Sequence, residues 1–416
     1  MDNRELAKQL KNNKQYDKAA PLFKDLWKKE QLYWDGWNYV HCLYLQGILD
    51  VAFNASFQIY KDNPGFLYNR NLLVRIINDK YFKNTKATYS SEEIYCLFDY
   101  VDMTYEILPD DRKNQIEFSV FRTIRIAKKH SNKIPFERIL KILSYLQIDN
   151  VSDQPYKGKY KEIQSNQEAY YAYKTKALFS LEEYAACIEC CDEAYEKIKN
   201  FHHDNDIWLR ERKMQSIAAL GDLHTAIKNA RELILLKNSW FLKYSLAQLL
   251  LKDGANKEAI VFLCRAAYTR DPIEMKVNLL VQLGDLIEET HIKESHFLLA
   301  RLTRLKKDWS IPNDLQNRLN GVIQRDVDLL DLKKFWLTKI QDYYGCHFGT
   351  IERISDNSKS GFIKENNRTY YFKTNNVING KVRKNDDVTF VLVESWDRKK
   401  GVKSQEADYI FIQKKF

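Results

Sequence analysis

Aromatic and basic residues gather near the C-terminal end of the chain. Phe362 lies in the segment Ser360-Gly361-Phe362-Ile363, and Tyr371 lies in Tyr370-Tyr371-Phe372-Lys373. Aromatic rings exposed on adjacent strands offer flat surfaces on which nucleobases stack, at about 1–3 kcal/mol per base. Lysine and arginine beside them neutralise phosphates and make binding depend on salt. The predicted contact residues are Arg353, Lys359, Phe362, Lys364, Tyr371, Lys373, Trp396, Arg398, Lys399, Lys400 and Lys403.

The order of these segments resembles a cold-shock domain, a small five-stranded barrel that binds single-stranded RNA or DNA. The first aromatic motif of that family, Lys-Gly-Phe-Gly-Phe-Ile, aligns with residues 358–363, where Phe362 keeps the second aromatic and Ser360 replaces the first. The second motif, Val-Phe-Val-His-Phe, aligns with residues 370–374 and leaves Tyr371 at the stacking position. The resemblance implies that Phe362 and Tyr371 stack on bases.

Departures from the family motifs change the predicted surface. Arg353 stands where the family has a tryptophan on its first strand, and its guanidinium plane can still stack. Lys373 takes the place of the histidine, and a basic loop, residues 398–403, follows Trp396. Trp396 either restores a lost stacking surface or packs on the barrel rim. The pattern favours contact with phosphates and weak sequence selectivity.

The same region predicts the barrel itself. After Gly345 the apolar period changes from helical to alternating, and Asn379-Gly380 and Lys400-Gly401 are turn signals. Short strands with these breaks fit a five-stranded OB-type barrel. Because such barrels also serve as docking modules, a protein-docking role stays open beside nucleic-acid binding.

Two other sets of residues have spacings that could carry chemistry. Cys187 and Cys190 have a zinc-ligand spacing, but a zinc site needs four ligands and no second pair lies at a sensible distance. Arg125 and His130 have the separation found in the ribonuclease motif of the higher-eukaryote/prokaryote nucleotide-binding helical family, with Ile126 at a usually polar position. We expect buried thiols and a basic helix face, and no catalytic residue, metal or cofactor.

Upstream of the barrel the sequence has a helical period and an internal repeat. Residues 221–223 with Ala226 are echoed 33 positions later by residues 254–256 with Ala259. This period, with small residues at the start of the second helix of each hairpin, resembles the tetratricopeptide repeat. The resemblance implies a solenoid that binds a partner protein on its concave face.

The chain is therefore predicted to be an α + β multidomain protein, an α-solenoid of helical hairpins with a C-terminal five-stranded β-barrel. The predicted parts are N-terminal repeats with an irregular helical middle at 1–150, a loop at 151–166, a second block of repeats at 167–325, a capping helix at 326–344 and the barrel at 345–416.

Charge and cysteine content narrow the function classes. The net charge is +10, and residues 345–416 hold 14 Lys and Arg against 9 Asp and Glu. This excess permits binding to polyanions without establishing it. The seven cysteines, the absence of a signal-peptide pattern and the lack of an apolar run of about 18 residues favour a cytoplasmic protein with free thiols and no membrane contact.

These features predict a non-catalytic adaptor. Its barrel would bind RNA or single-stranded DNA and its solenoid a protein partner, as in an accessory subunit of a bacterial RNA-handling or phage-defence system. One alternative is a protein-only scaffold whose barrel is a docking module. Another is a helical-domain ribonuclease that uses Arg125 and His130.

Overall fold

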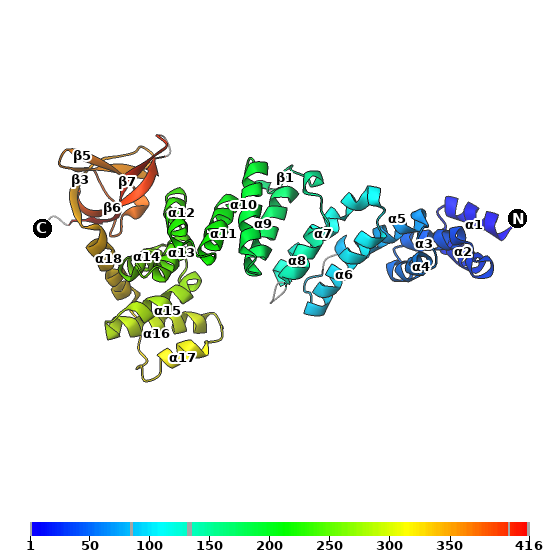
Figure 1. Ribbon diagram of the computed structural model, residues 1–416, viewed down its shortest axis with the longest axis horizontal. Coiled ribbons are helices and arrows are strands. Elements are labelled where there is room, and N and C mark those ends of the chain that lie inside the picture. Colours follow the sequence, from blue (N-terminus) through cyan, green and yellow to red (C-terminus); the bar gives the residue numbers. More distant parts are fainter. Residues whose placement is uncertain (1, 84–85, 131–134, 398–399, 414–416) are drawn as a thin grey trace. The chain divides into compact units, whose positions relative to one another are not determined.

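The computed structural model describes residues 2–83, 86–130, 135–397 and 400–413. They form two compact units, Met1–Arg212 and Lys213–Phe416. The first unit consists of helical hairpins, and the second combines helical hairpins with a closed five-stranded β-barrel (Figure 1). The predicted fold class, an α-solenoid of helical hairpins with a C-terminal five-stranded β-barrel, is confirmed.

The first unit is built from antiparallel helix pairs. Its helices are α1 (Asn3–Asn12), α2 (Tyr16–Glu30), α3 (Tyr33–Leu45), α4 (Leu49–Asp62), α5 (Leu67–Ile77), α6 (Ser91–Ile107), α7 (Glu117–His130), α8 (Phe136–Leu143), α9 (Asn166–Ser180), α10 (Tyr184–Lys197) and the start of α11 (Asn205–Ala219). Residues 151–166, predicted as a loop, include a short antiparallel pair, β1 (Tyr156–Lys157) with β2 (Glu162–Ile163).

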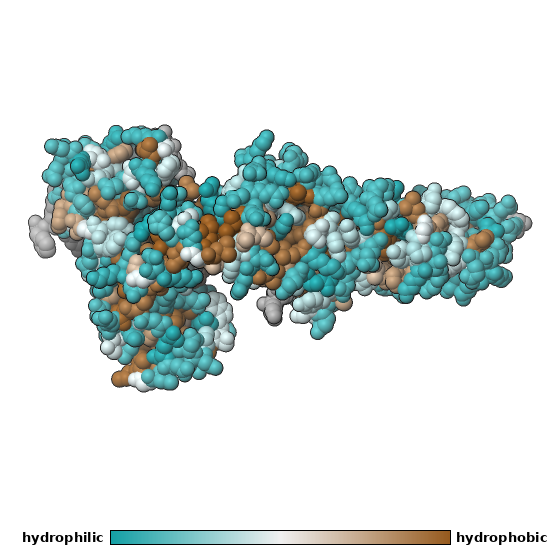
Figure 2. All heavy atoms as spheres, viewed as in Figure 1, coloured by the Kyte–Doolittle hydropathy of each residue, from teal (hydrophilic) through white to brown (hydrophobic). Residues whose placement is uncertain are grey.

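Small residues bring these helices close together. Ala19 on α2 and Ala52 on α4 are fully buried, at the repeat positions where the sequence predicts small side chains. Gly36 on α3 is also needed, because a Cβ atom there would lie 2.8 Å from the Trp27 indole of α2. The hydrophobic side chains gather between helices, and Figure 2 shows mostly hydrophilic residues on the visible surface around them.

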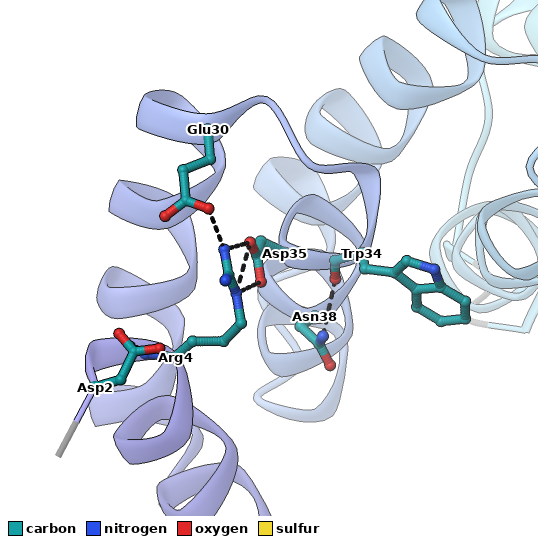
Figure 3. Close-up of polar contacts among 6 residues, drawn as sticks. All are labelled: Asp2, Arg4, Glu30, Trp34, Asp35 and Asn38. Atoms are coloured by element: carbon teal, nitrogen blue, oxygen red, sulfur yellow. Dashed lines mark hydrogen bonds and ion pairs between the residues drawn. The ribbon is translucent and has the colours of Figure 1, made fainter.

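A buried ion pair holds α1 against α3. The Arg4 guanidinium donates to both carboxylate oxygens of Asp35, at 2.9 and 3.2 Å, and to Glu30 at 2.5 Å (Figure 3). Asp35 is only 3% exposed. Without Arg4 its carboxylate would be buried and uncompensated, so this pair fixes the first hairpin to the second.

The second unit begins with repeats of the predicted register. Its helices are α12 (Leu223–Leu236), α13 (Trp240–Lys252), α14 (Asn256–Tyr268), α15 (Val277–Leu286), α16 (Thr290–Lys306), α17 (Asn313–Arg318) and α18 (Leu329–Tyr344). Gly221 and Gly254 open the second helices of successive pairs with φ of +99° and +80°. Glycine adopts this left-handed conformation without strain, which explains its recurrence at the turn.

Helix α18 packs on α14 and α16. Its Trp336 is fully buried, and the indole Nε1 donates to Nε2 of His296 at 2.8 Å. The other ring nitrogen of His296 lies 2.7 Å from the Ile292 carbonyl, so the neutral imidazole satisfies both neighbours. Burial lowers the pKa of His296 to about 4, which keeps it neutral.

The barrel contains β3 (His347–Ile354), β4 (Ser360–Glu365), β5 (Arg368–Lys373), β6 (Asp387–Asp397) and β7 (Val402–Ile412). It closes in the order β3-β4-β5-β7-β6, and only the β5–β7 pairing is parallel. Its core contains Ile351, Ile363, Tyr370, Phe372, Val388, Phe390, Ala407 and Ile410. None of the helices in the described part of the chain combines the length and apolar character needed to cross a membrane.

Candidate nucleic-acid interface

The outer face of β3, β4 and β5 carries a row of three side chains, Arg353, Phe362 and Tyr371, called here the outer row. Arg353 lies opposite Phe362 in the β3–β4 register, and Phe362 lies opposite Tyr371 in the β4–β5 register. The guanidinium carbon of Arg353 is 4.3 Å from the centre of the Phe362 ring. The Phe362 and Tyr371 rings meet edge to face, with centroids 5.8 Å apart. The predicted substitute for the family's tryptophan therefore does cover an aromatic ring.

Strand alternation and one glycine place this row on the outside. Ile363 and Phe372, the neighbours of Phe362 and Tyr371 along their strands, are fully buried, so the two aromatic rings of the row face outward. At Gly361 a Cβ atom would lie 2.6 Å from the Phe372 ring and 2.7 Å from the Arg353 carbonyl oxygen. Glycine is therefore required for the close approach of β3, β4 and β5 beneath the row.

Lysines lie at both ends of the aromatic pair. Lys364 follows Phe362 on β4 and pairs in register with Thr369, whereas Lys373 follows Tyr371 on β5 and pairs with Ser360. Because β4 and β5 are antiparallel, these two lysines lie on opposite sides of the rings. Both are exposed, as is Lys359 in the turn between β3 and β4.

One of these lysines is partly neutralised. Lys373 Nζ lies 3.4 Å from the Glu406 carboxylate, which is 8% exposed. Burial raises the pKa of Glu406, and the charge of Lys373 opposes that rise. Within the described residues, Lys359 and Lys364 form no ion pair. Their charges stay available to an anionic ligand.

The structure does not bring Trp396 together with the outer row. Trp396 lies opposite Lys403 in the β6–β7 hairpin. Lys403 is on the same face of β7 as Ala407, four residues further along the strand, and Ala407 points into the barrel core. Glu406 is on the opposite face of β7 and points outward to Lys373. Trp396 and Lys403 thus project from the hairpin face turned away from Glu406. Lys400 is exposed in the hairpin turn, and the predicted contacts Arg398 and Lys399 lie outside the described residues.

That inner face of the hairpin borders a pocket at the end of the barrel. The pocket has a volume of about 730 Å³. It is lined by Tyr343, Tyr344, His347, Glu365, Asn366, Asn367, Arg368, Tyr370, Leu392, Glu394 and Gln405. His347 Nδ1 lies 2.9 Å from the Glu365 carboxylate, and this contact links β3 to β4 in the pocket wall.

Another side of the barrel is docked on helices of its own unit. The Tyr409 ring packs on Tyr268 of α14 with centroids 5.4 Å apart, and the Arg270 guanidinium donates to the Asn375 carbonyl at 2.8 Å. Strand β6 also contacts α12 and α18. Tyr409 has a φ of +51°, beside a register shift in β6–β7. This irregularity turns Tyr409, next to the inward Ile410, towards the helices.

Buried charges lie in this docked interface. Lys243 of α13 and Arg265 of α14 are 3% and 6% exposed, and Arg265 donates to the Tyr344 hydroxyl at 2.6 Å. Burial, together with the charge of Arg265, lowers the pKa of Lys243 to about 7, and the charges of Asp408 and Asp271 oppose this shift. A lysine this deep loses its hydration, so its neutral form is favoured. The sequence analysis did not single out this residue.

The other sequence candidates lie in the first unit. Cys187 and Cys191 are fully buried on α10, where their thiols donate to the carbonyls of Thr175 and Leu209. Across the described ranges, no group of three or more His, Cys, Asp or Glu could hold a metal ion. Arg125 donates to Asn166 on α9, whereas the His130 ring packs on Tyr89. The two members of the possible ribonuclease pair therefore have different neighbours.

Comparison with known proteins gives only general likenesses. No protein-family model matches the sequence, and no curated protein matches it either. A tetratricopeptide repeat protein from Parabacteroides merdae is similar at 12% identity over 76% of this chain and 96% of that one, with a TM-score of 0.32. The structure of Naa15/Naa10 bound to HypK-THB is similar at 12% identity over 82% of this chain and 46% of that one, with a TM-score of 0.41. The human IFIT1 dimer with m7Gppp-AAAA is similar at 10% identity over 82% of this chain and 76% of that one, with a TM-score of 0.36.

Proposed function

We propose that the chain is a non-catalytic adaptor whose barrel binds RNA or single-stranded DNA and whose helical repeats bind a protein. The barrel would be a divergent member of the cold-shock or OB type, since its five strands close with a single parallel pairing between β5 and β7. The observation that carries the proposal is the outer row, Arg353, Phe362 and Tyr371, whose side chains share the outward face of β3, β4 and β5.

The outer row suits a single strand better than a duplex. Tyr371 is 38% exposed, and its ring presents a face that a splayed base can cover. Lys359 and Lys364 lie near the rings and can neutralise phosphates, whereas the charge of Lys373 is partly neutralised by Glu406. Stacking on the Phe362 and Tyr371 rings tolerates any base, because every base has a flat π-face, so weak sequence preference is expected.

The test is binding of labelled oligouridine and oligothymidine to the full chain. Phe362→Ala with Tyr371→Ala removes two stacking surfaces, so binding should weaken by at least about 30-fold, from about 1 kcal/mol or more per base. Phe348→Ala with Tyr160→Ala is the matched control, since both rings are exposed outside the row. Equal affinity of the two double variants would refute the stacking model.

A protein-only scaffold is the second candidate, and the docked side of the barrel supports it. The contacts of Tyr409 and Asn375 with α14 and the residues after it, beside the buried Lys243, support a docking role of the barrel within its own unit. If this were its sole role, neither oligonucleotide would bind the full chain at low salt, and the outer-row double variant would change only stability.

An exposed aromatic cluster supports the protein-binding half. Trp34 is 51% and Tyr68 56% exposed, their centroids are 4.7 Å apart, and Phe66 packs 5.1 Å from Trp34. Figure 3 shows the Trp34 indole pointing away from the Arg4–Asp35 pair. Exposed aromatic clusters of this kind mark protein interaction sites.

The charges near this cluster indicate the kind of segment that fits. Lys11 Nζ lies 4.5 Å from the Trp37 ring centre and, among the residues that the structure describes, donates only to the neutral Asn38. His41 stacks on the same indole, and burial, with Lys11 and Arg75, lowers its pKa to about 4. An acidic segment with an apolar anchor side chain would offset this positive potential. A cytoplasmic setting and a place in an RNA-handling or phage-defence system complete the proposal.

A further inference from the structure

Four basic side chains of the first unit lie on three helices that contact one another. Arg125 and Lys128 lie one turn apart on α7, Lys176 lies on α9 and Arg212 lies on α11. Arg125 Nη2 donates to Asn166 of α9 at 3.3 Å, and Arg212 Nη1 donates to Thr175 of α9 at 3.0 Å. These contacts join the three helices, and the four residues are called here the cation cluster.

The members of the cluster repel one another. Burial lowers the pKa of Lys128, and the charges of Lys176 and Arg212 lower it further. Burial and then Arg212 lower the pKa of Lys176. Burial also lowers the pKa of Arg212, while Cys191 and then Glu211 act in the other direction. Like charges held together in partly dehydrated surroundings leave an unsatisfied positive potential.

Several other cations of the same unit are paired with carboxylates, in contrast to this cluster. Arg138 and Lys141 both form ion pairs with Asp102, and Lys197 forms one with Asp149. Among the described residues, no carboxylate forms an ion pair with any member of the cation cluster. Folding alone would favour an acidic partner here as well, so the missing carboxylate points to an anion supplied from outside.

We propose that the cation cluster is a second binding site for the phosphodiester backbone of single-stranded nucleic acid. Its four side chains, two guanidinium and two ammonium groups, can only donate hydrogen bonds, and the Tyr173 hydroxyl oxygen beside them accepts from Arg125. Lys128 Nζ lies 4.6 Å from the Tyr173 ring centre, and within the described ranges its ammonium group forms no hydrogen bond or ion pair. Planar guanidinium forks match phosphate oxygens in two-point contacts.

A phosphate backbone fits better than an acidic peptide. A peptide bound in extended form presents backbone N–H groups as well as carboxylates, and it needs acceptors on the protein. The carbonyl oxygen of Asn166 is already engaged by Arg125, and the Thr175 hydroxyl accepts from Arg212. A phosphodiester chain presents only acceptors at its charged groups, in keeping with this set of donors.

The proposed site at the cation cluster does not depend on the barrel, and the two sites can be tested separately. In single strands each phosphate contact contributes about 0.7 to the slope of log K against log salt. Loss of two contacts should therefore lower the slope by roughly 1.4 and weaken binding about tenfold at about 0.15 M salt. The variant is Lys128→Gln with Lys176→Gln, because neither lysine donates a hydrogen bond or forms an ion pair in the described structure.

The experiment measures oligouridine binding to the full chain over a range of salt concentrations. Lys129→Gln with Lys199→Gln is the control, since both residues are exposed and the change in charge is the same. Each pair is also made in the Phe362→Ala, Tyr371→Ala background. A smaller salt slope for the cluster variant in both backgrounds is expected, and it would hold even if the barrel bound no nucleic acid.

Thermal unfolding without ligand supplies an independent readout. Because the lysines repel Arg212 and each other, the cluster variant should have an equal or higher Tm, which distinguishes a binding role from a structural one. Equal salt slopes for the two lysine pairs would overturn the proposal. Binding of polyglutamate but not oligouridine that depends on Lys128 and Lys176 would assign the site to a protein. Stabilisation by inorganic phosphate alone that depends on these lysines would assign it to a free anion. Either result would overturn the proposal.

Discussion

Replacement of Lys243 by methionine should stabilise the second unit. Lys243 is 3% exposed between the barrel and α13–α14, and Lys276 nearby is 1% exposed. Lys276 Nζ donates to the carbonyls of Ala267 and Thr269, at 3.1 and 2.7 Å, whereas Lys243 has no such acceptor among the described residues. Methionine keeps the length of the side chain and removes the ammonium group.

The magnitude follows from the depressed pKa. With about 1.4 kcal/mol for each pKa unit, a pKa lowered from 10.5 to about 7 corresponds to roughly 3–5 kcal/mol. Below pH 7 the Lys243 amine is protonated in both the folded and the unfolded chain, so the full cost of burying the ammonium group reduces the free energy of unfolding. Between pH 7 and about 10.5 the unfolded chain alone binds it, so the free energy of unfolding rises with pH across this window.

The assay is thermal and denaturant unfolding of the full chain from pH 7 to pH 10. At pH 7 a gain of about 3 kcal/mol should raise the Tm of a unit of this size by roughly 6–12 °C. The gain should shrink as pH rises, because the wild type then loses its own penalty. Lys252→Met on the same helix is the control, since Lys252 is exposed.

Lys276 has a pKa lowered to about 8 and contributes a slope of the same sign, so the difference between variant and wild type is the quantity that isolates Lys243. A Tm difference that does not change between pH 7 and pH 10 would refute the assignment of a neutral lysine. A lower Tm at pH 7 would show that the ammonium group stabilises the docked barrel through Asp408.

Three further outcomes are expected. Gly361→Ala should lower the free energy of unfolding by about 1–3 kcal/mol, relative to Ser360→Ala, because its Cβ atom would meet the Phe372 ring and a β3 carbonyl; equal Tm values would contradict the packing. Trp336→Phe should cost about 1–3 kcal/mol in denaturant unfolding, since it leaves Nε2 of the buried His296 without a donor. Stability should also fall as pH drops from about 6.5 to 4, since unfolded His296 binds a proton that the folded ring excludes, and His296→Gln should flatten that fall.

Much of the fold could be predicted from the sequence because its signals are local. Gly221 and Gly254 recur at 33 positions because each turn needs a left-handed residue, and both have a positive φ in the structure. The strands of the barrel were visible as alternation around Ile363 and Phe372, whose burial fixes which face Phe362 and Tyr371 share. These features depend on neighbours within one turn or one strand pair.

The side on which Trp396 lies could not be predicted. Its face is set by the β6–β7 register, which pairs it with Lys403 and not with the outward Glu406. A shift of one residue would have placed the indole beside the outer row. The docked interface was missed for a related reason, since burial of Lys243 depends on Tyr409 and Asp408, more than 160 positions away in the chain.

The cation cluster illustrates the same limit. Arg125 and Lys128 were interpreted from the sequence as the basic side of one helix, which is the ordinary meaning of such a run. Only the packing of α7, α9 and α11 adds Lys176 and Arg212, and only then does the lack of an acidic partner become informative. The helical period indicated that the repeats would stack, but not which exposed faces would meet.

The size of the outer row argues that the barrel does not act alone. Phe362 and Tyr371 offer stacking for about two bases, worth roughly 2–6 kcal/mol before the cost of ordering the strand. That range corresponds to a dissociation constant of about 0.04 mM or weaker. Lys373 adds little, because Glu406 already holds it. Useful affinity for a single strand therefore requires phosphate contacts beyond the barrel, and a salt slope larger than Lys359 and Lys364 can supply would point to cations elsewhere in the chain.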